Sequence, residues 1–225
     1  MTHPRLAMTA PLPLEDPHPL RAAHRVRREP RWQPLAQISN GALPQQVRRW
    51  LLDDGSLTGR LIEQQRGPFR VRRLVQGWQV PLPSEQRLLD IPPRQVAIVR
   101  EVALQQDSLT VVFARSVLPI SSLNGRLAHL RRLRNRPLGA ILFSNAGMRR
   151  SPFELARIAG DSDYLPAPLQ QDEPAWCRRS RFSLEGGSVM VSEVFLRDFR
   201  PWPALLPVHR TQRGKVSAAI VRTNQ

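Results

Sequence analysis

Cysteine is almost absent from this sequence of 225 residues, because Cys177 is the only one. A single cysteine cannot form an internal disulfide and cannot assemble a thiolate metal site. Histidine is scarce as well, and none of the five histidines lies at metal-ligand spacing from another in the central part of the chain. We therefore expect no metal site, and a reducing compartment such as the cytoplasm.

Long apolar runs are also missing. No window approaches the roughly 18 apolar residues that a membrane-spanning helix needs. The N-terminus lacks the apolar stretch of a signal peptide. We expect neither membrane insertion nor export.

Lysine is limited to Lys215, so the formal net charge of +16 comes almost entirely from arginine. Residues 1–38 carry a net charge of +3 and residues 197–225 one of +5, so half of the excess lies near the two ends. Such a charge can mark a nucleic-acid-binding protein, whose binding would be steeply salt-dependent. No Arg-Gly-Gly repeat or interleaved aromatic residue supports base stacking. We favour the codon bias of a GC-rich genome and expect no nucleic-acid partner.

Proline divides the chain into three parts. Residues 1–38 contain seven prolines and little periodicity, so we expect an irregular N-terminal extension. A second proline-interrupted segment, 200–225, is expected to form a basic tail. The remaining residues, 39–199, suffice for one compact domain.

Helical and strand-like patterns occupy separate parts of this domain. Apolar residues recur at helical spacing in four places: 44–54, after Ser56 as a cap, 123–133, and Pro137 to Phe143. A strand-like pattern is found in six segments: 69–80, 95–104, 109–118, 149–158, 177–184 and 188–196.

The links between these segments predict how the strands pair. The short polar link 105–108 and the turn Glu185-Gly186-Gly187 each indicate a hairpin, whereas a proline-rich connection joins 69–80 to 95–104. Strands joined by hairpins, with helices grouped apart, predict an α+β fold. We expect a single domain in which an antiparallel sheet of about six strands is covered by helices.

Charged residues interrupt the apolar rows of three expected strands. Side chains alternate between the two faces of a strand, and Arg100, Arg115 and Glu193 each stand where the alternation asks for an apolar group. An ionised group in such a row costs several kcal/mol, as an order of magnitude, unless it is paired or meets a ligand.

Two accounts of these charges are open. In one, Arg100 and Glu193 bridge each other across adjacent strands, or the local period is broken and one of them faces water. In the other, the charges converge on a ligand. A guanidinium binds a carboxylate through two parallel hydrogen bonds, so Arg100 and Arg115 together would suit a substrate with two carboxylates. Glu193 would then meet a hydroxyl group or a transferable proton.

Five segments taken together resemble the chorismate pyruvate-lyases. They are WLLDDGSLTGRL at 50–61, VREVAL at 99–104, ARSVLPISSL at 114–123, RPLGAILF at 136–143 and WCRRSRFSLEGGSVMVSEVFL at 176–196. Each segment is short, but their order and approximate spacing agree with that family over residues 43–196.

The resemblance implies a generally monomeric enzyme that needs no cofactor. Such an enzyme eliminates pyruvate from chorismate and leaves 4-hydroxybenzoate for ubiquinone synthesis. The resemblance also implies a six-stranded antiparallel sheet whose helices cover an internal ligand cavity. A nearly closed cavity that fits the product is expected to release it slowly, so we expect product inhibition.

The resemblance also assigns roles to individual residues. Arg100 matches the arginine that holds the carboxylate of the aromatic acid, and Glu193 matches the acidic residue at the other end of the ring. Arg115 matches a second arginine of the pocket. Leu57 and Leu138 fall where the backbone contacts the ligand carboxylate, and a backbone contact tolerates the Met that the family commonly has in place of Leu57. We therefore expect Arg100 and Glu193 to be catalytic and all five residues to bind substrate.

Two alternatives remain, a basic nucleic-acid-binding protein and a non-catalytic sensor of small acids. Ligand-binding domains of some transcription regulators share this fold class. A sensor of that kind would need a DNA-binding helix-turn-helix, and residues 1–38 are too rich in proline to form one.

Overall fold

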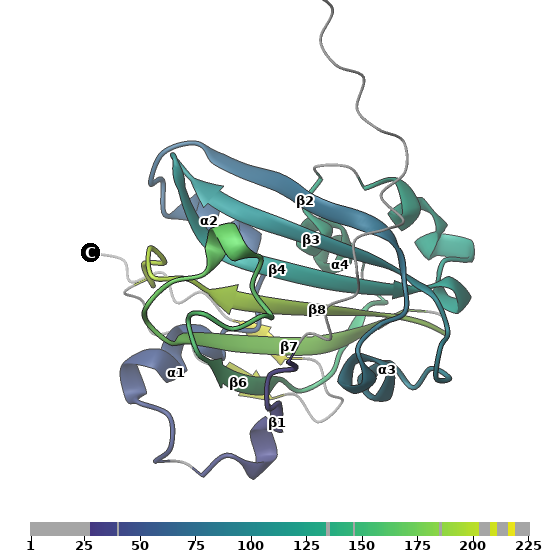
Figure 1. Cartoon of the computed structure of the whole chain (residues 1–225), viewed down its shortest axis with the longest axis horizontal. Helices are drawn as coiled ribbons and strands as arrows, with labels where there is room; N and C mark the ends of the chain where they lie inside the picture. The colour runs from purple at the N-terminus through teal and green to yellow at the C-terminus, as the bar shows by residue number, and fades with distance from the viewer. Residues whose placement is uncertain are drawn as a thin grey trace, which may run out of the picture.

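An antiparallel sheet forms the centre of the molecule in the computed structural model. The structure describes residues 28–39, 41–133, 136–145, 147–184, 186–202, 208–210 and 216–218, and of the last two segments only the backbone. The sheet runs in the order β1-β6-β7-β8-β4-β3-β2, and β5 pairs with β7 beside β6 (Figure 1). The predicted α+β fold and the antiparallel sheet are therefore confirmed.

Six strands of the sheet are long and two are short. The long strands are β2 (Phe69–Gln79), β3 (Ala97–Gln106), β4 (Leu109–Pro119), β6 (Glu154–Ile158), β7 (Ala175–Leu184) and β8 (Gly187–Phe195). The short ones are β1 (Gln33–Pro34) and β5 (Arg149–Arg150). The sheet thus has eight strands, and the expected count of about six was too low because a two-residue strand leaves no alternating pattern. Strands β9 (Val208–Arg210) and β10 (Val216–Ala218) pair separately.

Helices lie on both faces of the sheet. The α-helices are α1 (Gln45–Leu51), α2 (Leu57–Glu63), α3 (Pro83–Leu89) and α4 (Leu138–Ser144). Short 3-10 helices cover Leu35–Gln37, Ile120–Ser122, Gly125–Arg132 and Ala167–Leu169. None of the helices in the described part of the chain is both long and apolar enough to cross a membrane.

Local sequence signals explain several of these elements. The hydroxyl of Ser56 accepts a hydrogen bond from the backbone N–H of Gly59 at 3.2 Å, which confirms the expected cap of α2. The expected strand 149–158 is broken into β5 and β6, with Pro152 between them. The helical spacing at 123–133 forms a 3-10 helix rather than an α-helix.

Helix α3 was not expected, because the prolines around it suggested an irregular connection. Pro83 occupies its first turn, where the missing N–H costs nothing. The Glu85 carboxylate accepts a hydrogen bond from the backbone N–H of Leu82 at 2.9 Å, which closes the helix start. Helix α3 packs against β8 and covers one face of the sheet, which we call the α3 face.

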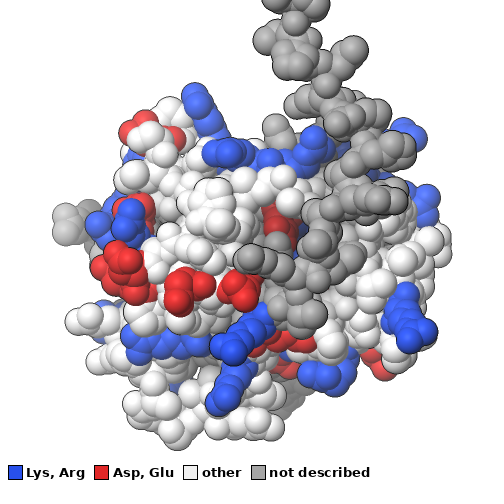
Figure 2. Space-filling model, in the orientation of Figure 1, with Lys and Arg blue, Asp and Glu red and all other residues white. Residues whose placement is uncertain are grey.

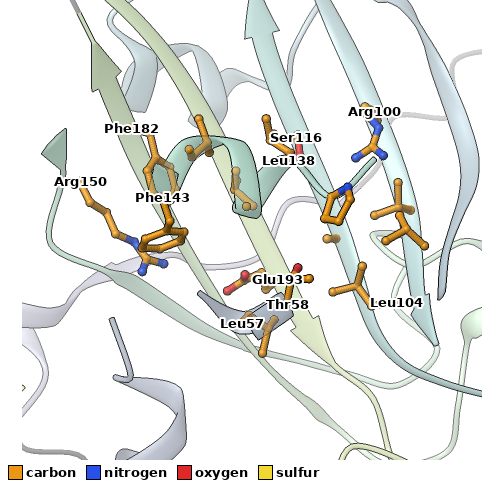
Figure 3. A pocket seen from close by; sticks show the side chains of 17 residues that line it. Leu57, Thr58, Arg100, Leu104, Ser116, Leu138, Phe143, Arg150, Phe182 and Glu193 are labelled. Atoms are coloured by element: carbon orange, nitrogen blue, oxygen red, sulfur yellow. The ribbon is translucent and has the colours of Figure 1, made fainter. Parts of the chain in front are cut away.

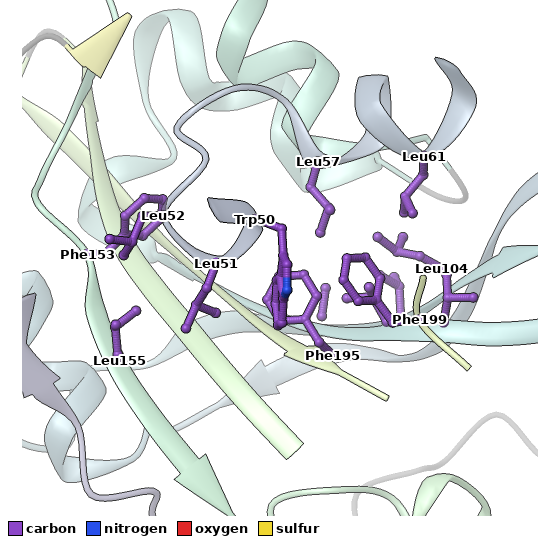
Figure 4. Close-up of a cluster of buried hydrophobic side chains, with 14 of the residues drawn as sticks. Trp50, Leu51, Leu52, Leu57, Leu61, Leu104, Phe153, Leu155, Phe195 and Phe199 are labelled. Carbon is purple, nitrogen blue, oxygen red and sulfur yellow. The ribbon is translucent and has the colours of Figure 1, made fainter. Parts of the chain in front are cut away.

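The opposite face, which we call the pocket face, is covered by α1, α2 and α4. On this face Trp50 of α1 packs against Phe195 and Phe199, with ring centroids 4.6 and 5.0 Å away (Figure 4). These contacts fix α1 and the connection to α2 against β8.

The two predicted tails lie largely outside the described residues. This holds for residues 1–27 and, in the C-terminal tail, for 203–207, 211–215 and 219–225. Within the described part, β1 pairs with β6, so residues 33–34 extend the edge of the sheet.

The pairing register decides which side each buried charge faces. Arg100 pairs with Ser116, and Glu101 pairs with Arg115. Because neighbours along a strand point to opposite faces, Arg115 and Glu101 share the α3 face, while Arg100 points to the pocket face.

On the α3 face Arg115 is held between two carboxylates. Its Nε and Nη2 donate to the carboxylate of Glu85 at 2.7 and 3.0 Å, and its Nη1 donates to Glu101 at 2.7 Å. All three side chains are buried. Burial alone would lower the pKa of Arg115, but the two carboxylates outweigh burial and raise that pKa above its ordinary value.

Replacing Arg115 by methionine is expected to lower the free energy of unfolding by about 3–5 kcal/mol, because it removes the guanidinium that pairs with two buried carboxylates. Urea unfolding followed by tryptophan fluorescence measures the change. Arg72→Met, at an exposed position of β2, is the control and should change stability by less than about 0.5 kcal/mol. An Arg115→Met protein as stable as this control would show that the ion-pair network does not hold α3 to the sheet.

Candidate active site

A pocket lies on the pocket face, between the central strands and helices α2 and α4. It contains about 520 Å³ of atom-free space, part of it open to solvent. Most of the seventeen lining residues are apolar, and the three charged ones are Arg100, Arg150 and Glu193. Figure 3 shows Arg100 and Arg150 at opposite ends of the pocket, with Glu193 between them.

Arg100 reaches the pocket from the middle of β3. The side chain is only 2% exposed, and its Nη2 donates to the backbone oxygen of Arg136, just before α4, at 3.0 Å. Burial, together with the charge of Arg73, lowers the pKa of Arg100 to about 10, which leaves the guanidinium charged at neutral pH. A buried cation facing a largely apolar pocket favours an anionic ligand.

Glu193 enters the pocket from β8 and is held by Arg178 of β7. The Oε2 atom of Glu193 accepts a hydrogen bond from Nε of Arg178 at 2.5 Å. The side chain of Arg178 is 1% exposed, whereas that of Glu193 is 13% exposed toward the pocket. Glu193 and Arg100 therefore do not bridge each other as the first account of the sequence proposed; the partner of Glu193 is Arg178.

Arg178 also holds the connection between α1 and α2. Its Nη1 donates to the backbone oxygens of Leu51 at 3.1 Å and Asp53 at 2.6 Å. One guanidinium therefore ties Glu193 to the segment that leads into α2. The sequence contains one signal for this residue: by alternation, Arg178 lies on the same strand face as Ser180 and Phe182. That Arg178 stands opposite Glu193 follows only from the pairing register of the two strands.

Leu57 and Leu138 both line the pocket. They are the first residues of α2 and α4. The first N–H groups of a helix have no acceptor within the helix. Two helix starts therefore border the pocket, although Ser56 already serves part of the first turn of α2.

Arg115 is the one expected site residue that the structure does not bring into the pocket. It lies on the α3 face, where Glu85 and Glu101 occupy its guanidinium. The expectation that Arg100 and Arg115 converge on one ligand was wrong because their strands pair with Arg100 opposite Ser116. Ser116, the residue next to Arg115 in β4, is the one that points to the same face as Arg100.

Sequence reasoning missed Arg150, which lines the pocket from β5. Its Nε donates to the hydroxyl of Ser180 at 2.7 Å, and its Nη1 donates to the backbone oxygen of Asp54 at 3.1 Å. Burial, reinforced by the charge of Arg178, lowers the pKa of Arg150 to about 9, although Glu193 and two aspartates oppose this shift. No pattern marked this residue, because its strand is two residues long.

The described residues contain no group of three or more His, Cys, Asp or Glu side chains that could hold a metal ion. Cys177 lies buried in β7, and burial raises the pKa of its thiol. In the view of Figure 2 the arginines are spread over the surface, with acidic side chains between them, and do not form one basic patch on that face.

Comparisons with known proteins agree on one family. The family model described as "Chorismate lyase" matches residues 26–202. A "Probable chorismate pyruvate-lyase" of Pseudomonas aeruginosa (strain UCBPP-PA14) is 44% identical over 147 residues, which cover 65% of this chain and 81% of the relative. A protein of the same name from Methylococcus capsulatus is 41% identical over 162 residues, which cover 71% of this chain and 96% of the relative.

Among solved structures, the fold is similar to the effector domain of PhnF from Mycobacterium smegmatis. The TM-score is 0.51 at 16% sequence identity, and the match covers 64% of this chain and 90% of that domain. This likeness concerns the fold alone.

The contacts of Arg178 predict that Arg178→Met loosens the connection between α1 and α2, because Glu193 and the backbone oxygens of Trp50, Leu51 and Asp53 lose their donor. Hydrogen–deuterium exchange of peptides covering residues 45–63 should accelerate by about tenfold or more, a loss of at least 1.4 kcal/mol in local stability. Arg181→Met on the same strand is the control, since Arg181 bonds to Ser188 at 2.9 Å and is half-buried. Equal exchange in the two variants would contradict this role of Arg178.

Proposed function

The chain belongs to the chorismate lyase family, and we propose that it eliminates pyruvate from chorismate and leaves 4-hydroxybenzoate. The observation that carries the proposal is the pocket itself, in which Arg100 and Glu193 stand apart among apolar side chains. A flat acid with a hydroxyl group at its far end fits this arrangement of one cation and one hydrogen-bond acceptor. In this role the protein supplies 4-hydroxybenzoate for ubiquinone synthesis.

The chemistry of chorismate determines what the protein must do. The substrate is a cyclohexadiene with a ring carboxylate and an enolpyruvyl ether that carries a second carboxylate. When the ether oxygen leaves its ring carbon and the adjacent carbon, which bears the hydroxyl, loses its hydrogen, the ring becomes aromatic. All atoms of the substrate then appear in 4-hydroxybenzoate and pyruvate, so no oxidant and no water is consumed. Binding the folded conformer and excluding water are the main tasks of the pocket.

Arg100 binds the ring carboxylate in this proposal. Its guanidinium is buried and charged, and a planar fork of N–H donors matches a carboxylate in two parallel hydrogen bonds. The starts of α2 and α4, at Leu57 and Leu138, border the pocket and add backbone N–H donors for the same carboxylate.

Glu193 binds the opposite end of the ring. Its ion pair with Arg178 occupies one carboxylate oxygen and leaves the other toward the pocket. An ion-paired carboxylate accepts hydrogen bonds and does not donate them. Glu193 therefore accepts a hydrogen bond from the ring hydroxyl group and orients the substrate beside the ether. The hydrogen lost from the ring carbon is transferred within the substrate, to the departing enolpyruvyl group.

The catalytic unit of the proposal is the domain 39–199, since the proposed ligand-binding residues run from Leu57 to Glu193. We propose that it acts as a monomer in the cytoplasm and without a cofactor. The family resemblance supports the monomer and the absence of a cofactor, and the single, buried cysteine fits a reducing compartment.

The test is to incubate the purified protein with chorismate, without added metal or cofactor, and to measure pyruvate and 4-hydroxybenzoate. Both products should form in equal amounts. Arg100→Ala and Glu193→Gln should each lower kcat/KM by about 30- to 1,000-fold, because the loss of a buried charged partner costs roughly 2–4 kcal/mol. The exposed Arg72→Ala serves as the matched control. Ligand binding without turnover would overturn the enzyme and favour the sensor.

Slow product release is a second consequence of the pocket. An apolar chamber with Arg100 and Glu193 at two ends of a planar ring also fits 4-hydroxybenzoate. Progress curves should bend well before the substrate is consumed, and added 4-hydroxybenzoate should lower the initial rate competitively. Curves that stay linear in the presence of added 4-hydroxybenzoate would contradict this expectation.

A further inference from the structure

The substrate of the proposed reaction has two carboxylates, and Arg115, the expected second ligand, lies on the other face of the sheet. We propose that Arg150 binds the enolpyruvyl carboxylate of the substrate at the end of the pocket opposite Arg100. This inference rests on the proposed function and adds a second anion-binding residue to the same site.

The hydrogen bonds of Arg150 leave part of its guanidinium available to a ligand. Its two acceptors, the hydroxyl of Ser180 and the backbone oxygen of Asp54, are both neutral and engage Nε and Nη1. In the described part of the chain no carboxylate oxygen lies within ion-pair distance of Arg150. The Nη2 group is therefore free to donate to a carboxylate in the pocket.

Aromatic rings hold the guanidinium of Arg150 in place. Its central carbon lies 4.1 Å from the ring centroid of Phe153, 5.0 Å from that of Phe182 and 5.7 Å from that of Phe143. Phe143 and Phe182 also line the pocket, and Figure 3 shows both beside Arg150. A guanidinium stacked in this way presents its N–H edge rather than its faces to a ligand.

The carboxylate of Asp54, whose backbone oxygen accepts a hydrogen bond from Arg150, is not hydrogen-bonded to Arg150. Asp54 is buried, and neither of its carboxylate oxygens has a hydrogen-bond partner in the described structure. Burial, followed by the charge of Asp53, raises the pKa of Asp54, although Arg150 and Arg178 oppose this shift. Among the described residues no carboxylate pairs directly with Arg150, so a substrate carboxylate can take that place.

The charges of the pocket agree with this assignment. Arg100 and Arg150 line the pocket while Glu193 is paired with Arg178, and chorismate at neutral pH carries one carboxylate for each of these two arginines. With one carboxylate at each end, the enolpyruvyl group is held at a fixed place relative to the ring. The reaction then leaves 4-hydroxybenzoate on Arg100 and pyruvate on Arg150.

This division predicts that Arg150 distinguishes substrate from product. Arg150→Ala should lower kcat/KM for chorismate by about 30- to 1,000-fold. The inhibition constant of 4-hydroxybenzoate should change less than threefold, because that product has no second carboxylate. Arg100→Ala should weaken both. Pyruvate should inhibit the wild type competitively and should lose this effect in Arg150→Ala.

The controls separate this inference from the proposed function. Arg149→Ala, at the exposed neighbouring position of β5, should behave as the wild type. Binding of 4-hydroxybenzoate to Arg150→Ala, measured by calorimetry, shows whether the pocket of this variant is intact. If Arg150→Ala does not bind 4-hydroxybenzoate, Arg150→Lys becomes the deciding variant, since it keeps the positive charge but loses the parallel N–H donors of the guanidinium. Its kcat/KM for chorismate and its binding of 4-hydroxybenzoate are then measured, and kcat/KM should fall at least tenfold. A wild type without turnover would refute the proposed function. The role of Arg150 would be refuted if the wild type is active and the deciding variant keeps its kcat/KM. It would also be refuted if the deciding variant loses kcat/KM and 4-hydroxybenzoate binding in parallel.

Discussion

The cost of burying a charge governs both faces of the central sheet. On the α3 face this cost is met within the protein, because Arg115 is held by Glu85 and Glu101. On the pocket face Glu193 is matched by Arg178, whereas Arg150 is bound only by neutral oxygens and aromatic rings among the described residues. The buried charges of the α3 face are thereby paired within the protein, whereas the pocket face keeps Arg150 with neutral acceptors only among the described residues.

The pocket depends on how these charges are attached to the fold. Arg178 binds Glu193 and the backbone before α2 at the same time, so the acceptor in the pocket and one wall of the pocket share an anchor. Trp50 fastens α1 to the sheet through its contacts with Phe195 and Phe199. The position of Glu193 in the pocket and the packing of α1 and α2 are thus coupled through one guanidinium.

The sequence predicted features that depend on local pattern. The hairpin of β3 and β4 and the cap at Ser56 follow from alternation and from a side chain close by in the chain. The side of Arg115 could not be predicted, because a shift of one residue in register moves a side chain to the other face. Arg150 and α3 were missed for a related reason: a two-residue strand has no period, and prolines concealed a helix that tertiary contacts stabilise.

The central claim is that Arg100 and Glu193 bind the two ends of one planar acid on the pocket face. A crystal structure of the protein with 4-hydroxybenzoate tests this claim most directly. The account predicts the carboxylate of the ligand against the guanidinium of Arg100 and its hydroxyl within hydrogen-bond distance of Glu193. A ligand bound outside this pocket, or bound in it with its carboxylate away from Arg100, would contradict the account.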